Sequence, residues 1–136
     1  MPVYPGVSMI RLSVEDLSRA RAFYERLGWR LSMAMSSSDF ACFALNNIAL
    51  TLEARPLRGA PETPALTLIQ CHGGPRSVEA ALEHALSAGA TLIQNSRPTP
   101  AGGVSARFAD LEGHVWELTC DPRLELGHDG AVSPPP

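Results

Sequence analysis

The hydrophobic pattern near the start of this chain changes from a period of two to a helical period. Apolar and polar side chains alternate over residues 7–14, which predicts a strand with one buried face. Over residues 17–27 the apolar side chains recur at helical spacing, Asp16 suits the N-cap position, and Gly28 suits the position after the last turn. A short strand is expected next, over residues 29–33.

The same succession returns later in the chain. Residues 65–71 predict a strand, Ser77 suits the N-cap of a second helix, and Gly89 suits its end. A short strand is again expected directly after the glycine, over residues 90–94. A pattern that repeats at this length indicates a duplicated structural unit.

Each copy then closes with a predicted β-hairpin. Asn46 and Asn47 suit the turn of the first hairpin and Gly113 suits that of the second, because these residue types tolerate the positive φ that tight turns need. The paired strands are expected over residues 40–45 and 48–53, and over 104–109 and 114–119. The order β-α-β-β-β, occurring twice, predicts an α+β fold.

The repeat and the length of 136 residues predict a single domain. A proline-rich stretch between the two copies suits a linker, and the C-terminal residues lack a periodic apolar face. We expect one domain over residues 1–126, made of module one (5–54), a linker (55–64) and module two (65–121), followed by a flexible tail (127–136).

Composition argues against several classes of partner. The net charge of −3 and the lack of basic clusters disfavour nucleic acid, and no apolar run approaches the ~20 residues that span a membrane. Pro2 and Pro5 do not fit a secretory signal. The three cysteines are widely spaced, which favours reduced thiols in a cytoplasmic protein.

Two segments resemble the signature motifs of a known family. Leu12 to Trp29 resembles the V-x-D-L-x-x-(S/A)-x-x-F-Y-x-x-L-G opening of the vicinal oxygen chelate superfamily. Phe108 to Leu118 resembles that superfamily's F-x-D-P-(D/E)-G-(H/N)-x-(W/I)-E-L ending. The superfamily includes glyoxalase I, extradiol dioxygenases, fosfomycin-modifying transferases and bleomycin-binding resistance proteins. The resemblance implies two βαβββ modules whose curved mixed sheets surround a cleft, commonly completed in a homodimer.

The resemblance also implies where a metal would be held. Metal-using relatives place a His on the first strand and a Glu or His on the last strand of each module. The matching positions here hold Met9, Thr51, Ala65 or Leu66, and Glu117. One carboxylate is too few for a divalent ion, and thioether sulfur prefers soft metals. We therefore expect no metal and no cofactor.

The rest of the expected cleft suits a small molecule, with an apolar lining and a few polar groups. Glu117 either accepts a hydrogen bond from a ligand or pairs with Arg11 or Arg107, because an unpaired buried carboxylate is too costly. Arg11 either faces Glu117 in one pocket or extends into solvent. Alternatively, the two sheets simply pack together there. The expected ligand-binding residues are Met9, Arg11, Phe40, Cys42, Thr51, Glu53, Val115 and Glu117.

Three functions remain open at this point. The first is a metal-independent homodimer that binds an apolar or aromatic small molecule, as in antibiotic resistance by drug sequestration of the bleomycin-resistance type. The second is a metal-free isomerase, cyclase or lyase with Glu117 as general base. The third is a divalent-metal enzyme of the glyoxalase or dioxygenase kind, with displaced ligands such as Glu53, His72 and Glu117.

Overall fold

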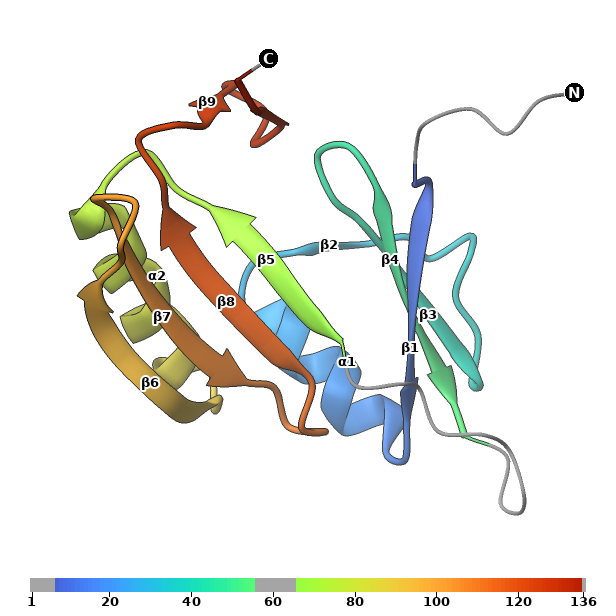
Figure 1. The fold of residues 1–136 in the computed structure, drawn as a ribbon. Helices are drawn as coiled ribbons and strands as arrows, with labels where there is room; N and C mark the ends of the chain where they lie inside the picture. The colour runs from blue at the N-terminus through green and yellow to red at the C-terminus, as the bar shows by residue number, and fades with distance from the viewer. Residues whose placement is uncertain (1–6, 56–65, 136) are drawn as a thin grey trace, which may run out of the picture.

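Both expected βαβββ modules are present in the computed structural model, which describes residues 7–55 and 66–135 (Figure 1). Module one consists of β1 (Met9–Val14), α1 (Leu17–Arg26), β2 (Arg30–Leu31), β3 (Phe40–Ala44) and β4 (Ala49–Ala54). Module two consists of β5 (Thr67–Cys71), α2 (Pro75–Ser87), β6 (Thr91–Pro98), β7 (Val104–Ala109) and β8 (Val115–Cys120). The predicted α+β fold is confirmed. All of the predicted linker except Arg55 lies outside the described residues.

Each module contributes one mixed four-stranded sheet. The first sheet has the strand order β1-β4-β3-β2 and the second has the order β5-β8-β7-β6. The first strand of each module pairs in parallel with the last, and the other pairs are antiparallel. The strands β1 and β5 therefore each form an edge of their sheet.

The helices begin and end largely as their sequences predict. The Asp16 side chain caps α1 by accepting a hydrogen bond from the Arg19 amide at 3.0 Å. Gly28 and Gly89 follow the two helices with φ of 84° and 112°, a left-handed conformation that favours glycine. The Ser77 cap is wrong: α2 begins at Pro75, whose missing N–H costs nothing in the first turn.

The two hairpin turns differ from one another. Gly113 has the expected positive φ of 86°. Asn46 and Asn47 do not, since no described residue other than glycine has positive φ, so that prediction is wrong. The β3–β4 turn is instead closed by a hydrogen bond from the Leu45 amide to the Ile48 carbonyl at 2.9 Å. The chain can therefore turn here without the left-handed conformation.

The C-terminal segment contains a short hairpin that its sequence does not signal. Strand β9 (Glu125–Leu126) pairs antiparallel with β10 (Val132–Ser133). The side-chain amide of Asn47 donates to the Asp129 carboxylate at 3.0 Å, in the orientation that satisfies both of its polar ends. The expected tail thus folds back and contacts the β3–β4 turn of module one.

Helix α1 lies between the two sheets (Figure 1), and the ring of its Tyr24 lies near Phe43 of β3 and Trp116 of β8. Tyr24 is fully buried and stacks on Trp29 at a ring-centroid distance of 5.2 Å. It also lies 6.3 Å from Trp116 of β8, which in turn lies 5.3 Å from Trp29. Trp116 is on the helix-facing side of its strand. Aromatic burial of this size supplies much of the apolar contact between the modules.

A chain of buried hydrogen bonds runs through the same cluster. The indole N–H of Trp116 donates to the Tyr24 hydroxyl oxygen at 3.1 Å, and the Tyr24 hydroxyl donates to Asp110 Oδ2 at 2.6 Å. Asp110 Oδ1 accepts from the amides of Glu112 and His114 at 2.9 and 2.8 Å. Burial, reinforced by the nearby Asp110 carboxylate, raises the pKa of Tyr24 well above 10 and keeps its proton in place. Both signature motifs meet in this network.

Replacing Tyr24 by phenylalanine tests whether the network joins the modules. The variant leaves Asp110 Oδ2 and the Trp116 N–H without their partner in a buried site, so the free energy of unfolding should fall by about 1–3 kcal/mol. Urea denaturation measures this change. Ser87→Ala, which removes an exposed hydroxyl bonded to the His84 carbonyl, is the control and should change stability by less than about 0.5 kcal/mol. Equal effects of the two variants would contradict the assignment.

Candidate functional site

The predicted residues of module one share the helix-free face of the first sheet. In the strand register Arg11 lies beside Thr51, which lies beside Cys42. Thr51 and Cys42 are buried, whereas the Arg11 side chain is 64% exposed. Met9, Phe40 and Glu53 lie on the same face by the same alternation. The face therefore has a buried centre and an exposed, partly charged margin.

The predicted residues of module two share the helix-free face of the second sheet. Val115 and Glu117 of β8 alternate with the buried Trp116 and Leu118, as the sequence predicts. Ile69 of the edge strand β5 lies beside Glu117 on this face and is 60% exposed. An exposed isoleucine beside a carboxylate makes this face amphipathic.

Glu117 pairs with an arginine of its own sheet. The Nε and Nη2 atoms of Arg107 both lie 2.9 Å from Glu117 Oε1, and the Glu117 side chain is only 19% exposed. Glu117 Oε2 has no hydrogen-bond partner among the described residues, so it remains available as an acceptor. The expected pairing with Arg107 is thus found, and a contact with Arg11 is not. Arg11 is directed largely to solvent, with its Nε 3.5 Å from Glu53 Oε2.

The two faces do not meet within one chain. Helix α1 lies on the side of the first sheet that is nearer to the second sheet, so the helix-free face of the first sheet is directed away from Glu117 (Figure 1). The contact between Tyr24 and Trp116 fixes this arrangement from inside. Neither of the predicted alternatives, one shared pocket or two sheets packed on these faces, is formed by a single copy.

No three histidine, cysteine, aspartate or glutamate side chains in the described parts of the chain lie close enough together to hold a metal ion. Glu53 and Glu117, two of the expected displaced ligands, lie on different sheets. The third, His72, lies with its Nε2 atom 2.8 Å from Gln70 Oε1. Because an amide oxygen only accepts, the imidazole tautomer with its proton on Nε2 donates this hydrogen bond. A displaced metal site would need ligands that one copy does not bring together.

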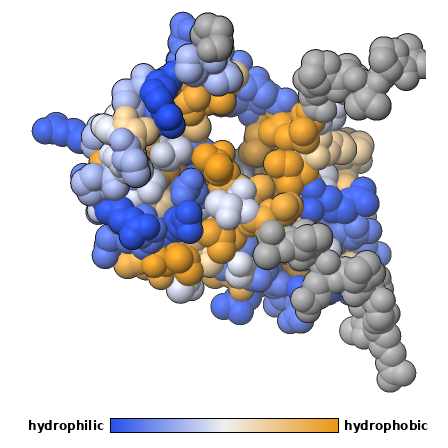
Figure 2. Space-filling model, viewed as in Figure 1, coloured by the Kyte–Doolittle hydropathy of each residue, from blue (hydrophilic) through white to orange (hydrophobic). Residues whose placement is uncertain are grey.

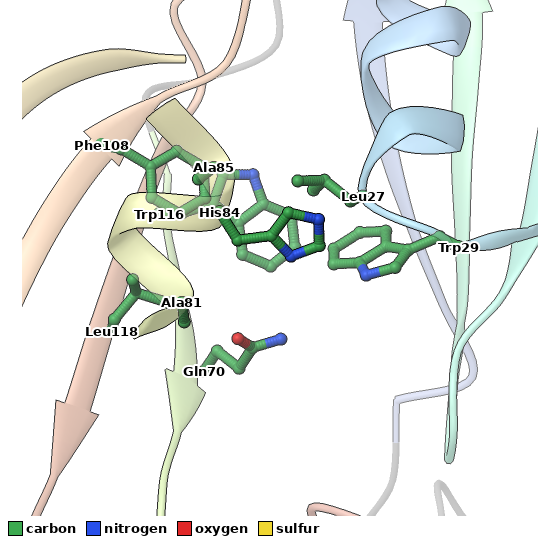
Figure 3. Close-up of a pocket in the computed structure, with 9 residues that line it drawn as sticks. All are labelled: Leu27, Trp29, Gln70, Ala81, His84, Ala85, Phe108, Trp116 and Leu118. Carbon is green, nitrogen blue, oxygen red and sulfur yellow. The ribbon is translucent and has the colours of Figure 1, made fainter. Parts of the chain in front are cut away.

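The structure also contains a cavity that sequence reasoning missed. A space of about 280 Å³ lies between the modules, and Figure 2 shows its opening bordered largely by apolar residues. Trp29, Gln70 and Trp116 line it, and the same three residues line a smaller hollow of about 60 Å³ beside it (Figure 3). One signal of this cavity was present in the sequence. Gln70 lies two residues after the buried Leu68, so this polar residue is on the same face of β5. None of the eight predicted ligand-binding residues lines either space.

Two titratable groups follow Gln70 at the end of β5. Burial lowers the pKa of His72, because the cationic imidazolium is less well solvated there. Burial also raises the pKa of the Cys71 thiol, with smaller contributions from the negative charges of Asp121 and Glu117. Both pKa shifts favour the uncharged side chains, the neutral imidazole of His72 and the thiol of Cys71.

The comparisons with known proteins agree with this fold. A family model described as bleomycin resistance protein-like N-terminal matches residues 10–46. A glyoxalase-related enzyme from Fulvimarina pelagi is similar at 24% identity, with 96% of this chain and 98% of that chain covered and a TM-score of 0.80. A glyoxalase/bleomycin resistance protein/dioxygenase from Nocardioides has 21% identity, 93% coverage of both chains and a TM-score of 0.72.

A glyoxalase/bleomycin resistance protein/dioxygenase family enzyme from Burkholderia phytofirmans PsJN is similar at 19% identity, with 83% of this chain and 96% of that chain covered and a TM-score of 0.70. No curated protein matches the chain significantly. The chain therefore has the vicinal oxygen chelate fold, which confirms the resemblance seen in the two motifs. In the described residues, neither helix has the length and apolar character needed to cross a bilayer.

The lowered pKa of His72 predicts a pH-dependent contribution to stability. As pH falls, the unfolded chain binds the proton first, near the ordinary value of 6.5, so the folded state loses stability below that pH. In His72→Gln this loss between pH 7.5 and pH 5 should be smaller than in the parent protein, as measured by urea midpoints at both pH values. Ser87→Ala, which changes an exposed residue without a titratable side chain, is the control and should leave the pH dependence unchanged. A His72 variant with the parent's pH dependence would refute the prediction.

Proposed function

We propose that the protein is a metal-independent small-molecule-binding protein that works as a homodimer. The observation that carries this proposal is the arrangement of Glu117. Its carboxylate is largely shielded from solvent and ion-paired through one oxygen, while the second oxygen has no described partner. Such a group is preorganised to accept a hydrogen bond from a ligand that covers the face.

The edge strands support completion of the site by a second copy. Strand β1 ends the first sheet and β5 ends the second, so neither has a neighbouring strand on its outer side among the described residues. Exposed apolar side chains accompany both edges, with Met9 at 51% and Ile69 at 60% exposure. In the proposed dimer β1 of one copy lies beside β5 of the other, which joins the helix-free faces into one curved cleft. A twofold axis forms two such clefts.

The chemistry of the two faces indicates the class of ligand. Met9 and Ile69 supply apolar surface, Glu117 supplies an acceptor, and Arg11 supplies an exposed cation. An apolar or aromatic molecule with a hydrogen-bond-donating group for Glu117 and an acceptor group for Arg11 would satisfy this set. Sequestration of a drug of this kind is the proposed role, and the match of residues 10–46 to the bleomycin resistance-like model supports it.

One observation also favours a second candidate function. The available Glu117 Oε2 could take a proton from a bound substrate, as a metal-free isomerase, cyclase or lyase requires. The two functions differ in what the carboxylate must do. A binder needs an acceptor, which an amide oxygen can replace, whereas a general base needs a group that takes up the proton.

The dimer proposal predicts opposite results at the two edges of the second sheet. Ile69→Lys puts a charge on the β5 edge and should convert the dimer to a monomer of 14.5 kDa, measured by light scattering during gel filtration. Ile93 of β6 is similarly exposed, at 52%, on the opposite edge, and Ile93→Lys should leave the dimer intact. A parent protein that is monomeric, or equal effects of the two variants, would overturn the proposal.

Replacing Glu117 by glutamine separates binding from catalysis. Native mass spectrometry of the protein purified from its own source, with and without a chelator, should show a chelator-insensitive dimer with a bound organic mass. Glu117→Gln should weaken retention of that compound by about 10-fold, because a neutral acceptor replaces a charged one. Exposed Glu83→Gln is the control. Chemical conversion of the compound by the parent, abolished in Glu117→Gln, would favour the enzyme, and a metal mass removed by the chelator would contradict both functions.

A further inference from the structure

We propose that the cavity between the modules is a second binding site, present in each copy, for a planar aromatic molecule with a hydrogen-bond acceptor. Its volume of about 280 Å³ is near the lower end of the ~300–1,000 Å³ range of ligand pockets. That size suits a molecule of one or two rings. Ile69 borders both this cavity and the proposed cleft, but the charged groups of the cleft, Arg11 and Glu117, do not line the cavity.

Aromatic and aliphatic side chains form the walls. Trp29 comes from module one and Trp116 from module two, and their rings lie 5.3 Å apart in an edge-to-face arrangement. Leu50 and Leu68, each on the helix-facing side of its own sheet, continue the apolar lining. A flat ring inserted here would contact aromatic faces or edges from both modules, an arrangement that favours aromatic ligands over flexible aliphatic ones.

Gln70 supplies the polar group that orients the ligand. Its Oε1 accepts the hydrogen bond from His72 Nε2 at 2.8 Å, which fixes the amide and directs Nε2 away from His72. Figure 3 shows this nitrogen pointing into the space on the side of Trp29. In the described part of the chain Nε2 has no hydrogen-bond partner. A carbonyl, ether or phenolic oxygen on the ligand is the group that this donor requires.

The C-terminal hairpin contributes to the border of the cavity. Asp129, Gly130 and Val132 line it together with Asn47 of module one, which donates to the Asp129 carboxylate at 3.0 Å. A segment with no periodic apolar face thus supplies part of the lining. The cavity therefore has lining residues from both modules and from the C-terminal segment.

The tryptophans make the proposal directly measurable. The chain has only two, Trp29 and Trp116, and both line the cavity, so intrinsic fluorescence reports its occupancy. The probe is 4-bromobenzamide, which combines a planar ring, a carbonyl acceptor and a bromine atom that quenches a tryptophan in contact with it. Titration of the protein with this probe should give saturable quenching. Crystals grown with the probe should show the bromine inside the cavity, in contact with the Trp29 and Trp116 side chains that line it.

Two variants and a control identify the site. Gln70→Leu removes the donor and should weaken binding by about 5- to 10-fold. Ile48→Phe enlarges a partly exposed lining side chain and should weaken binding by taking up part of the space. Ile93→Phe makes the same change on β6, outside the lining, and should bind as the parent does. Quenching that never saturates in the parent would overturn the proposal. So would quenching in Gln70→Leu and Ile48→Phe that saturates at the same probe concentration as in the parent.

Discussion

The buried hydroxyl of Tyr24 is the point at which the two modules are joined. It donates to Asp110 and accepts from Trp116, so one side chain of module one satisfies two polar groups of module two. The site is buried, and any other docking of the modules would leave these groups without partners, at a cost of a few kcal/mol. The network therefore determines how the two sheets are oriented relative to each other. It also gives a physical reason for the presence of Tyr24 in the first signature motif and of Asp110 and Trp116 in the second.

The orientation has direct consequences for binding. With α1 between the sheets, the helix-free faces that carry Arg11 and Glu117 are directed apart, and in the described part of the chain neither β1 nor β5 has a strand on its outer side. A second copy is the simplest partner that brings two such faces together, since a twofold axis uses both edges of both chains. The same docking leaves the cavity between the modules that Trp29 and Trp116 border. One constraint thus accounts both for the proposed cleft and for the proposed second site.

The sequence predicts the fold well because the fold rests on local patterns. Alternation in β1 and β8 assigns each residue to the correct face, and the two motifs identify the superfamily fold. The errors concern features that neighbouring residues do not determine. Pro75 competed with Ser77 for the start of α2, and the hairpin at Asn46 closes without positive φ. In both cases more than one local geometry was compatible with the same residue types.

The candidate site was less predictable than the fold. Alternation shows which face Arg11 and Glu117 occupy, but not that each has an oppositely charged neighbour in its own sheet, at Glu53 and Arg107. Which charged partner each of these side chains takes depends on the strand register and on the distance between the sheets. The sequence specifies neither. The cavity was missed for the same reason, since the docking angle of the modules creates it. Only Gln70, polar at an otherwise apolar position, could have signalled it.

The most direct test of this account is an isotope-filtered NMR measurement on a dimer assembled from one methyl-labelled and one unlabelled copy. The filter selects contacts between chains and removes those within a chain. The account predicts cross-peaks between the Met9 methyl of one copy and the Ile69 methyl of the other, because adjacent strands lie about 5 Å apart. Inter-chain contacts confined to other surfaces, such as the β6 edge, would contradict the claim that module docking leaves β1 and β5 to complete the site between two copies.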